Sequence, residues 1–213
     1  SIALTSRDKS SETPIPLCGV PYHAATNYIA KLLRAGRTVA LCEQVEDPKL
    51  AKGLVRREVV RLYTPGTLID SEFLPSTESN VLAAVSVRLR SAGTGRKECP
   101  YGLATLEVST GDYWLSEFQG PRAEASLQYE LARLEPKELL FPEDLSPDEQ
   151  QWTADLTGPR CCAQPATWFD LEQGRMTLQE QFRVHSMEAF GCHRLTLGIQ
   201  AGAAVLRYVR ETQ

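Results

Sequence analysis

The chain has 213 residues, a hydrophobic content of 42% and a formal net charge of −4 at pH 7. This length suits one large domain or two small ones, and the hydrophobic content is ordinary for a folded protein. The sequence shows no signal peptide and no apolar run near the ~20 residues that a membrane span needs. The negative charge argues against nucleic-acid binding through global charge, so such binding would need a local basic surface.

The first third of the chain predicts one helix between short extended segments. The helix, residues 23–35, has apolar side chains at helical spacing and Gly36 where a C-cap belongs. Residues 37–44 and 55–63 have the composition of strands, and Thr64–Thr67 (TPGT) has that of a turn. The end of a strand, a polar loop and an extended lead-in are expected before the helix, at residues 1–5, 6–13 and 14–16.

A polar stretch that contains Pro75 and has no periodicity marks a domain boundary. We place the first domain at residues 1–70, a linker at 71–79 and the second domain at 80–213.

The second domain predicts strands first and helices later. A strand precedes a hairpin, and a helix and a short buried strand follow, at residues 80–89, 101–108, 112–118, 122–134 and 138–141. Residues 144–155 are ambiguous and favour a helix; further helices are expected at 171–182, interrupted near Gly174, and at 195–212. Three early strands followed by alternating helix and strand are the element order of ribonuclease-H-like folds.

Four sequence blocks occur in one order and at one spacing: Pro16–His23 (PLCGVPYH), Leu41–Gln44 (LCEQ), Gly53–Val60 (GLVRREVV) and Thr64–Thr67 (TPGT). They resemble the mismatch-binding domain of the MutS family of bacterial DNA mismatch-repair proteins, and the resemblance continues more loosely to the C-terminus. It implies an α/β fold in two parts: a partial mixed-sheet mismatch-recognition domain, then a ribonuclease-H-like connector domain.

The resemblance also implies a function for the parent protein. Family members bind mispaired or looped-out bases, bind and hydrolyse ATP with Mg²⁺, form a homodimer and recruit a MutL-type partner. The connector is implied to relay between the DNA-binding and ATPase domains and to form part of the MutL docking surface. Mismatched double-stranded DNA and a MutL-type protein are thus the expected partners, with no membrane and a cytoplasmic, nucleoid-associated location.

Several family features are absent from this sequence. It has no Phe-x-Glu pair where the family places its mismatch-reading side chains, and no phosphate-binding loop. It begins at Ser1 without a methionine, so we expect a piece of a longer protein, without the clamp, lever and ATPase domains. For this chain we therefore expect no catalytic residue, no cofactor, no metal, and a first domain that is less stable than the second.

Five residues are predicted to contact DNA: Arg7, Lys9, Leu17, His23 and Arg61. In a polar loop, Arg7 and Lys9 would contact phosphate or the minor groove. Leu17 and His23 bracket a Gly-Val-Pro turn that would press an apolar group and a donor into the minor groove. The alternatives are solvated loop charges for Arg7 and Lys9, a core Leu17, and a capping or surface His23.

Arg61 belongs to a basic cluster on the predicted strand 55–63. By strand alternation Arg57 and Arg61 share one face and Arg56 points the other way. We favour a solvated sheet face for Arg56 and Arg57 and leave Arg61 open.

Two other functions remain as alternatives. One is a metal-dependent ribonuclease-H-like nuclease that would use Glu107, Asp112 and Glu138, although turn and surface roles are favoured for these acids. The other is a protein-interaction module with no DNA role.

Histidines and cysteines offer weaker signals. His185 and His193 lie near Cys192, but a surface loop is favoured over a metal site. Among the six cysteines, Cys18 and Cys42 lie in apolar settings and are predicted to pack as small hydrophobes. The adjacent Cys161 and Cys162 are expected to be ordinary reduced thiols, with an exposed redox site as the alternative.

Overall fold

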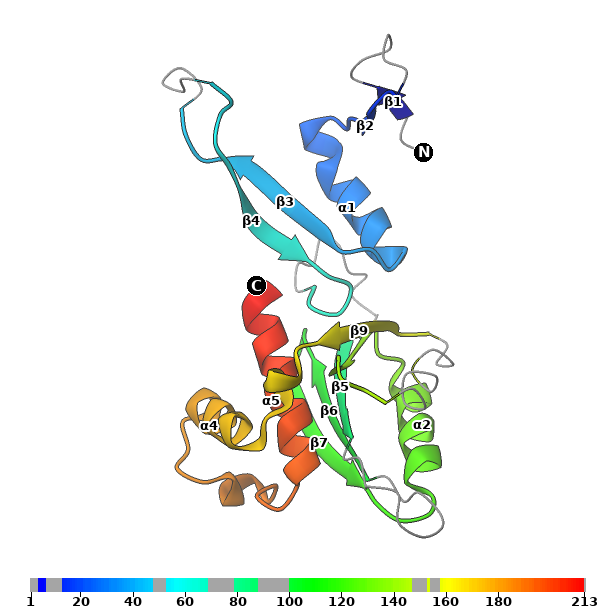
Figure 1. The fold of residues 1–213 in the computed structure, drawn as a ribbon, viewed down its shortest axis with the longest axis vertical. Helices are drawn as coiled ribbons and strands as arrows, with labels where there is room; N and C mark the ends of the chain where they lie inside the picture. The colour runs from blue at the N-terminus through cyan, green and yellow to red at the C-terminus, as the bar shows by residue number, and fades with distance from the viewer. Residues whose placement is uncertain are drawn as a thin grey trace.

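The protein, seen here as a computed structural model, has two parts stacked along its long axis (Figure 1). The structure describes residues 4–6, 13–47, 53–68, 79–87, 100–146, 153 and 158–212. Strands β1 to β4 and helix α1 lie at one end, and the remaining strands and helices form the other. No helix in these described ranges is long and apolar enough to span a membrane.

Two separate two-stranded antiparallel ribbons flank one helix in the N-terminal part. The elements are β1 (Leu4–Ser6), β2 (Pro16–Cys18), the 3₁₀ helix η1 (Tyr22–Ala24), α1 (Ala25–Arg34), β3 (Val39–Gln44) and β4 (Arg57–Tyr63). The expected C-cap glycine is confirmed, because Gly36 has φ +70° and its N–H donates to the carbonyl oxygen of Leu33 at 2.9 Å. The strand β2 was not predicted, because Pro16 indicated only an extended lead-in.

The described residues of the N-terminal part bury little apolar surface. Their hydrophobic cluster has three buried members, Ala30, Leu33 and Leu68, with Ile29 and Tyr63 packed against them. Burial of apolar area is the main stabilising term in folding, so this small cluster is consistent with the lower stability expected for this part.

A five-stranded mixed sheet forms the centre of the second part, in the order β7-β6-β5-β8-β9. Its strands are β5 (Val81–Val87), β6 (Tyr101–Glu107), β7 (Asp112–Phe118), β8 (Glu138–Pro142) and β9 (Arg160–Gln164). Strands β5, β6 and β7 pair antiparallel, whereas β8 pairs parallel with both β5 and β9. The strand β9 was not predicted, because its sequence RCCAQ is short and only weakly apolar.

Helices cover both faces of this sheet (Figure 1). Helix α2 (Ala123–Leu134) packs on one face through Leu127 and Leu131, against Ala83 and Leu139. Helix α5 (Thr196–Thr212) packs on the other face, where its side chains meet those of alternate strand residues. The cluster on the α5 face comprises Leu82, Ala84, Ala104, Leu140, Phe169, Ala201, Ala204, Val205 and Tyr208.

Helix α4 (Leu171–Phe182) lies against α5, and two 3₁₀ helices, η2 (Ala166–Phe169) and η3 (Met187–Phe190), accompany it. The predicted interruption near Gly174 is wrong: α4 is continuous through it. A Cβ on Gly174 would lie 3.2 Å from Cβ of Ala203, so the missing side chain allows close packing of α4 on α5 rather than a break. Most of the ambiguous segment 144–155 lies outside the described residues.

The predictions for the cysteines are partly wrong. Cys18 and Cys42 are exposed, so their predicted packing as small hydrophobes is wrong. Both lie in two-stranded ribbons, which have too few neighbouring elements to bury them. Cys161 and Cys162 are half-buried free thiols on β9 rather than an exposed pair.

Candidate functional site

The residues predicted to contact DNA all belong to the N-terminal part. Arg7 and Lys9 lie outside the described residues. Leu17 is on β2, with 48% of its surface exposed, and is not a core residue. His23 is exposed in η1, and Arg61 is half-buried on β4. The structure thus places the three described residues on different elements of the same part.

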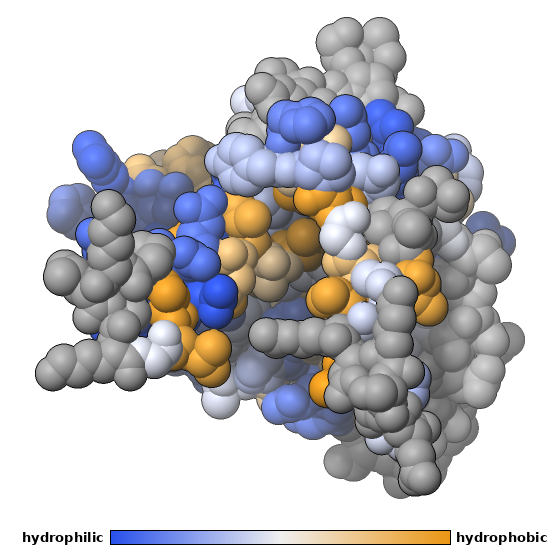
Figure 2. Space-filling view, turned by 90° about the horizontal axis from the view of Figure 1, so that it is seen from above, coloured by the Kyte–Doolittle hydropathy of each residue, from blue (hydrophilic) through white to orange (hydrophobic). Residues whose placement is uncertain are grey.

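Around Leu17, the chain exposes an unusual amount of apolar surface. Leu4 is 77% exposed, Ile15 is 72% exposed and Tyr22 is 90% exposed. Figure 2, seen from the end of the molecule that carries β3, β4 and α1, shows apolar side chains gathered around a hollow among hydrophilic ones. Because large exposed apolar groups are typical of binding surfaces, the β1–β2 ribbon and its exit are candidates for contact with another molecule.

A β-bulge changes which arginines share a face of the β3–β4 ribbon. Leu41 pairs with Arg61 and Cys42 pairs with Val59, so Val60 is an extra residue in β4. Paired residues point to the same face, and Leu41 and Cys42 point to opposite faces. Val59 is on the face of Arg57, so Arg57 and Arg61 lie on opposite faces and the predicted shared face is wrong.

Arg56 lies on the face of Arg61 instead. The Arg56 guanidinium makes an ion pair with Glu58, which lies two residues further along the chain on the same face. The guanidinium of Arg61 lies over the ring of Tyr63, 4.9 Å from the ring centroid. On this face of the ribbon, Arg56 is therefore paired with an acid, and the guanidinium of Arg61 is packed on an aromatic ring.

The carboxylates needed for the nuclease alternative do not converge. Glu107 pairs with Val81 and with Asp112, so these side chains share the face that α2 covers. Glu138 pairs with Leu82, whose side chain packs on the opposite face, toward α5. Because the two acidic groups lie on opposite faces of one sheet, Glu107 and Glu138 cannot bind the same metal ion.

Glu107 instead organises the turn around it. Its carboxylate accepts hydrogen bonds from the hydroxyl of Ser79, from the backbone N–H of Asn80 at 3.0 Å and from the hydroxyl of Ser109 at 2.7 Å. Burial raises the pKa of Glu107, but these hydrogen bonds outweigh burial and leave its pKa below the ordinary value. Asp112 accepts from Thr110 at 2.8 Å, as a turn acid does.

The histidine region also does not form a metal site. Within the described ranges, no group of three or more His, Cys, Asp or Glu side chains could hold a metal ion. Cys192 is buried and its thiol donates to the carbonyl oxygen of Met187 at 3.6 Å. The carbonyl oxygen of His193 accepts from Arg175 at 3.3 Å, which makes this segment part of the packing of α4.

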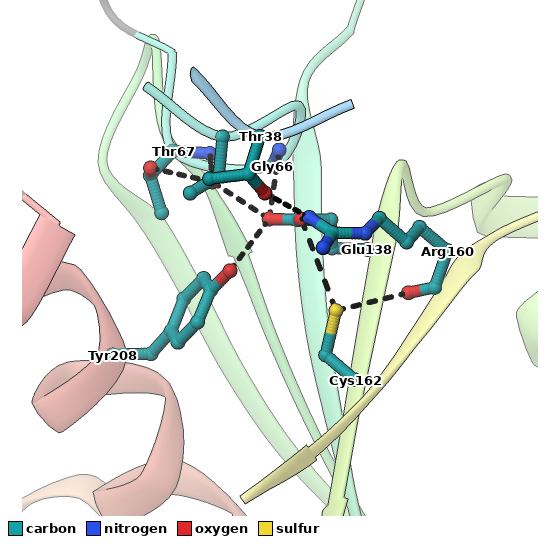
Figure 3. Close-up of polar contacts among 8 residues, drawn as sticks. Thr38, Gly66, Thr67, Glu138, Arg160, Cys162 and Tyr208 are labelled. Carbon is teal, nitrogen blue, oxygen red and sulfur yellow. Dashed lines mark hydrogen bonds and ion pairs between the residues drawn. The ribbon is translucent and has the colours of Figure 1, made fainter. Parts of the chain in front are cut away.

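The most heavily bonded side chain that the structure reveals is Glu138, where the two parts of the chain meet (Figure 3). Its side chain is fully buried. Its Oε2 atom accepts hydrogen bonds from Thr64 Oγ1 at 2.7 Å, from Gly66 N at 3.1 Å and from Tyr208 OH at 3.2 Å. Its Oε1 atom accepts from Nη1 of Arg160 at 2.9 Å, in an ion pair.

Every polar group that faces Glu138 is a donor, as an ionised carboxylate requires because it can only accept. Burial, reinforced by the charge of Glu138, raises the pKa of Tyr208 far above its ordinary value. Burial likewise raises the pKa of the Cys162 thiol to about 11, with Glu138 adding to the shift. Both groups therefore remain protonated near neutral pH and able to donate, with Cys162 Sγ 3.9 Å from Oε1.

The sequence carried a signal for this cluster. Glu138 begins an otherwise apolar strand, ELLFP, where a charged residue is unusual, and the Thr-Pro-Gly-Thr turn forms one of the four family blocks. Nothing in either segment indicated that the two would meet. The surface role favoured for Glu138 is therefore wrong, because its side chain is fully buried in an ion pair with Arg160.

The fold defines an α/β protein of two parts, and its N-terminal part carries exposed apolar side chains. The family model described as MutS domain I matches residues 1–72, and the one described as MutS domain II matches residues 80–213. The chain therefore belongs to the MutS family.

Three curated relatives, each named DNA mismatch repair protein MutS, illustrate the similarity. The protein of Syntrophobacter fumaroxidans is 46% identical over 212 residues, covering 98% of this chain and 22% of the relative. That of Desulforapulum autotrophicum is 41% identical, covering 100% of this chain and 23% of the relative. That of Syntrophomonas wolfei is 37% identical, covering 100% of this chain and 24% of the relative. The chain thus spans about a quarter of the length of these relatives.

Proposed function

We propose that this chain is the part of a MutS-type mismatch-repair protein that contacts mismatched duplex DNA through residues 1–70 and carries that domain on a connector, residues 80–213. The observation that carries the proposal is the match of two consecutive MutS domain models over almost the whole chain. The relatives are named as DNA mismatch repair proteins, which supports a role in the same process.

The surface of the N-terminal part supports contact with DNA. Exposed apolar residues on the β1–β2 ribbon, including Leu17, are of the kind that minor-groove proteins insert at base steps. On another element Arg61 supplies a positive charge for phosphate. Since the net charge is −4, the interaction depends on this local surface rather than on a global field.

The second part is proposed to be a ribonuclease-H-like connector without catalysis of its own. Three antiparallel strands followed by two parallel strands, with helices on both faces, agree with the expected element order. The placement of Glu107 and Glu138 on opposite faces of the sheet supports a non-catalytic role. ATP hydrolysis with Mg²⁺, dimerisation, recruitment of a MutL-type partner and a nucleoid-associated cytoplasmic location are proposed for the parent protein.

The test is fluorescence anisotropy of this chain with matched and G·T-mismatched duplexes across a salt series. We expect weak binding that falls steeply with salt and shows no preference for the mismatch, because phosphate contacts produce a steep salt slope and residues 1–70 contain no Phe-x-Glu pair. Absence of binding at low salt would contradict the DNA role. Binding with a flat salt slope would favour the protein-interaction alternative instead.

The nuclease alternative has its own assay. Incubation of a labelled duplex with Mg²⁺ or Mn²⁺ is expected to leave the DNA intact with this chain. Cleavage that disappears in Glu107→Ala would overturn the non-catalytic assignment, since that substitution removes the acid on which the alternative depends.

A further inference from the structure

The two parts of the chain are joined through one buried carboxylate. We infer that Glu138 is a positioning residue that fixes the DNA-contacting part on the connector. This inference deepens the proposed function and rests on it for the DNA-binding role of the N-terminal part. The contacts themselves do not depend on DNA: Thr64 and Gly66 belong to the N-terminal part, whereas Arg160 and Tyr208 belong to the connector.

The carboxylate needs donors from both parts. A buried charge is costly unless it is paired and hydrogen-bonded. The connector supplies Arg160 from β9 and Tyr208 from α5, and the turn after β4 supplies the hydroxyl of Thr64 and the N–H of Gly66 (Figure 3). If the turn moved away, Oε2 would keep only the hydrogen bond from Tyr208. The turn is therefore held against β8 because the buried carboxylate would otherwise lose two of its donors.

Two further hydrogen bonds cross the same joint. The Arg160 guanidinium donates to the hydroxyl of Thr38, just before β3, as well as to Glu138. The side-chain amide of Asn80 donates to the carbonyl oxygen of Leu68 at 2.9 Å. Arg160 therefore bridges the carboxylate and the N-terminal ribbon, and the joint restrains the turn from more than one direction.

The turn approaches so closely because residue 66 is a glycine. A Cβ on Gly66 would lie 2.8 Å from Oε2 and 2.9 Å from Cβ of Glu138, distances that real Cβ atoms essentially never show. Thr64 and Thr67 are each 1% exposed, and their hydroxyl oxygens lie 2.7 Å apart. The Thr-Pro-Gly-Thr block is thus shaped to fit one carboxylate on the other part of the chain.

Native-state amide hydrogen exchange of the full chain tests this inference, with Glu138→Gln as the first variant. A carboxamide has one oxygen, so its NH₂ group must face either the Gly66 N–H or the Arg160 guanidinium, both of which can only donate. We expect the amides of residues 64–68 to exchange at least about tenfold faster, the effect of losing one hydrogen bond to a charged group. The amides of β5 and β6, at the centre of the connector sheet, should keep their protection.

Gly66→Ala tests the same joint from the other side of the contact and leaves the connector sequence intact. It should accelerate exchange over residues 64–68 as Glu138→Gln does, and the double variant should show less than the sum of the two effects because both break one contact. Gly53→Ala is the matched control, since a Cβ there meets nothing within 4 Å. Glu117→Gln is the control for a structural carboxylate inside the connector, and it should perturb α5 instead.

Three results would overturn the inference. Unchanged exchange over residues 64–68 in Glu138→Gln would show that the carboxylate does not hold the turn. A uniform loss of protection across β5 and β6 in both variants would show a general structural role. Additive effects of Glu138→Gln and Gly66→Ala would show that the two residues act separately. The exchange measurement uses no DNA, so failure of the DNA-binding assay leaves these outcomes readable.

Discussion

Gly102, in strand β6, lies directly beneath the first turn of helix α5. A Cβ on Gly102 would be 2.2 Å from the carbonyl carbon and 2.4 Å from the carbonyl oxygen of Leu197, and 2.6 Å from the backbone nitrogen of Gly198. The side chain of Ser86, which pairs with Gly102 on the neighbouring strand, donates to the same carbonyl oxygen at 2.6 Å. The helix backbone therefore rests directly on the backbone of Gly102.

We predict that Gly102→Ala lowers the free energy of unfolding of the connector by about 3 kcal/mol, the upper end of the usual cost of overpacking. The added methyl group meets backbone atoms of Leu197, which cannot rotate away as a side chain can. Thermal or urea unfolding followed by circular dichroism measures the change. Gly174→Ala is the comparison: its Cβ meets a side chain at 3.2 Å and gains helix propensity, so it should change stability by less than about 1 kcal/mol. Equal effects of the two substitutions would contradict this account.

Glu117 is predicted to stabilise α5 from outside the helix. Its Oε1 atom accepts from the backbone nitrogens of Leu197 at 2.6 Å and Gly198 at 3.2 Å, which are otherwise among the unpaired donors of the first helical turn. Glu117→Ala should lower the free energy of unfolding by about 1–2 kcal/mol, and Glu117→Gln by less because the amide oxygen still accepts. Thermal unfolding distinguishes these variants, and indistinguishable melting curves for Glu117→Ala and the parent chain would refute the capping role.

The stability contribution of Glu107 is predicted to depend on pH. Its pKa in the folded protein lies below the ordinary value of 4.5, so the folded state favours the charged form. The contribution is fully present above pH 4.5 and is lost as the pH falls through the lowered folded pKa. Glu107→Gln should therefore destabilise the protein at neutral pH, and the difference from the parent chain should narrow below pH 4.5. Urea unfolding at a series of pH values measures this stability difference. A difference that widens in acid would contradict the prediction.

Arg61 and Arg57 form a matched pair for testing DNA contact, because the bulge at Val60 puts them on opposite faces. If the face of Arg61 contacts phosphate, Arg61→Ala should weaken binding to matched and mismatched duplexes alike and reduce the slope of log affinity against log salt by about 1. Arg57→Ala removes the same charge from the other face and should have a smaller effect. Anisotropy titrations at several salt concentrations provide the comparison, and equal losses would mean that only total charge matters.

Thiol reactivity should follow exposure and pKa. Cys18 and Cys42 are exposed, whereas Cys162 is half-buried with a pKa raised to about 11. Because the thiolate is the nucleophile, iodoacetamide at mildly alkaline pH should alkylate Cys18 and Cys42 well before Cys162. Mass spectrometry of timed digests gives each rate in one experiment, with the same sites in urea as the control. Faster reaction of Cys162 in the native chain would contradict its placement beside Glu138.

Local pattern was sufficient for most elements. The helix at α1 with its glycine cap, the strands β3 to β8 and the helix α5 follow from apolar spacing and turn residues within each segment, and they are present with small shifts at their ends. The order of four short blocks was sufficient to identify the family, and the match to MutS domain I confirms it.

Where prediction from the pattern failed, the deciding contact was remote. Strand alternation placed Arg57 and Arg61 together, but pairing with β3 inserted a bulge. Gly174 predicted a helix interruption, but α4 is continuous there, and the glycine allows α4 to pack closely on α5. Cys18 was predicted to be a buried hydrophobe, but no other described element covers it in the two-stranded ribbon.

The sequence by itself determined most element types, most apolar faces and the family, because each depends on residues a few positions apart. Only the tertiary structure decided the role of Glu138, because its partners Thr64, Tyr208 and Arg160 are 74, 70 and 22 residues away along the chain. The solvation of a buried charge depends on which donors the folded chain brings within hydrogen-bonding distance, and no local pattern contains that information.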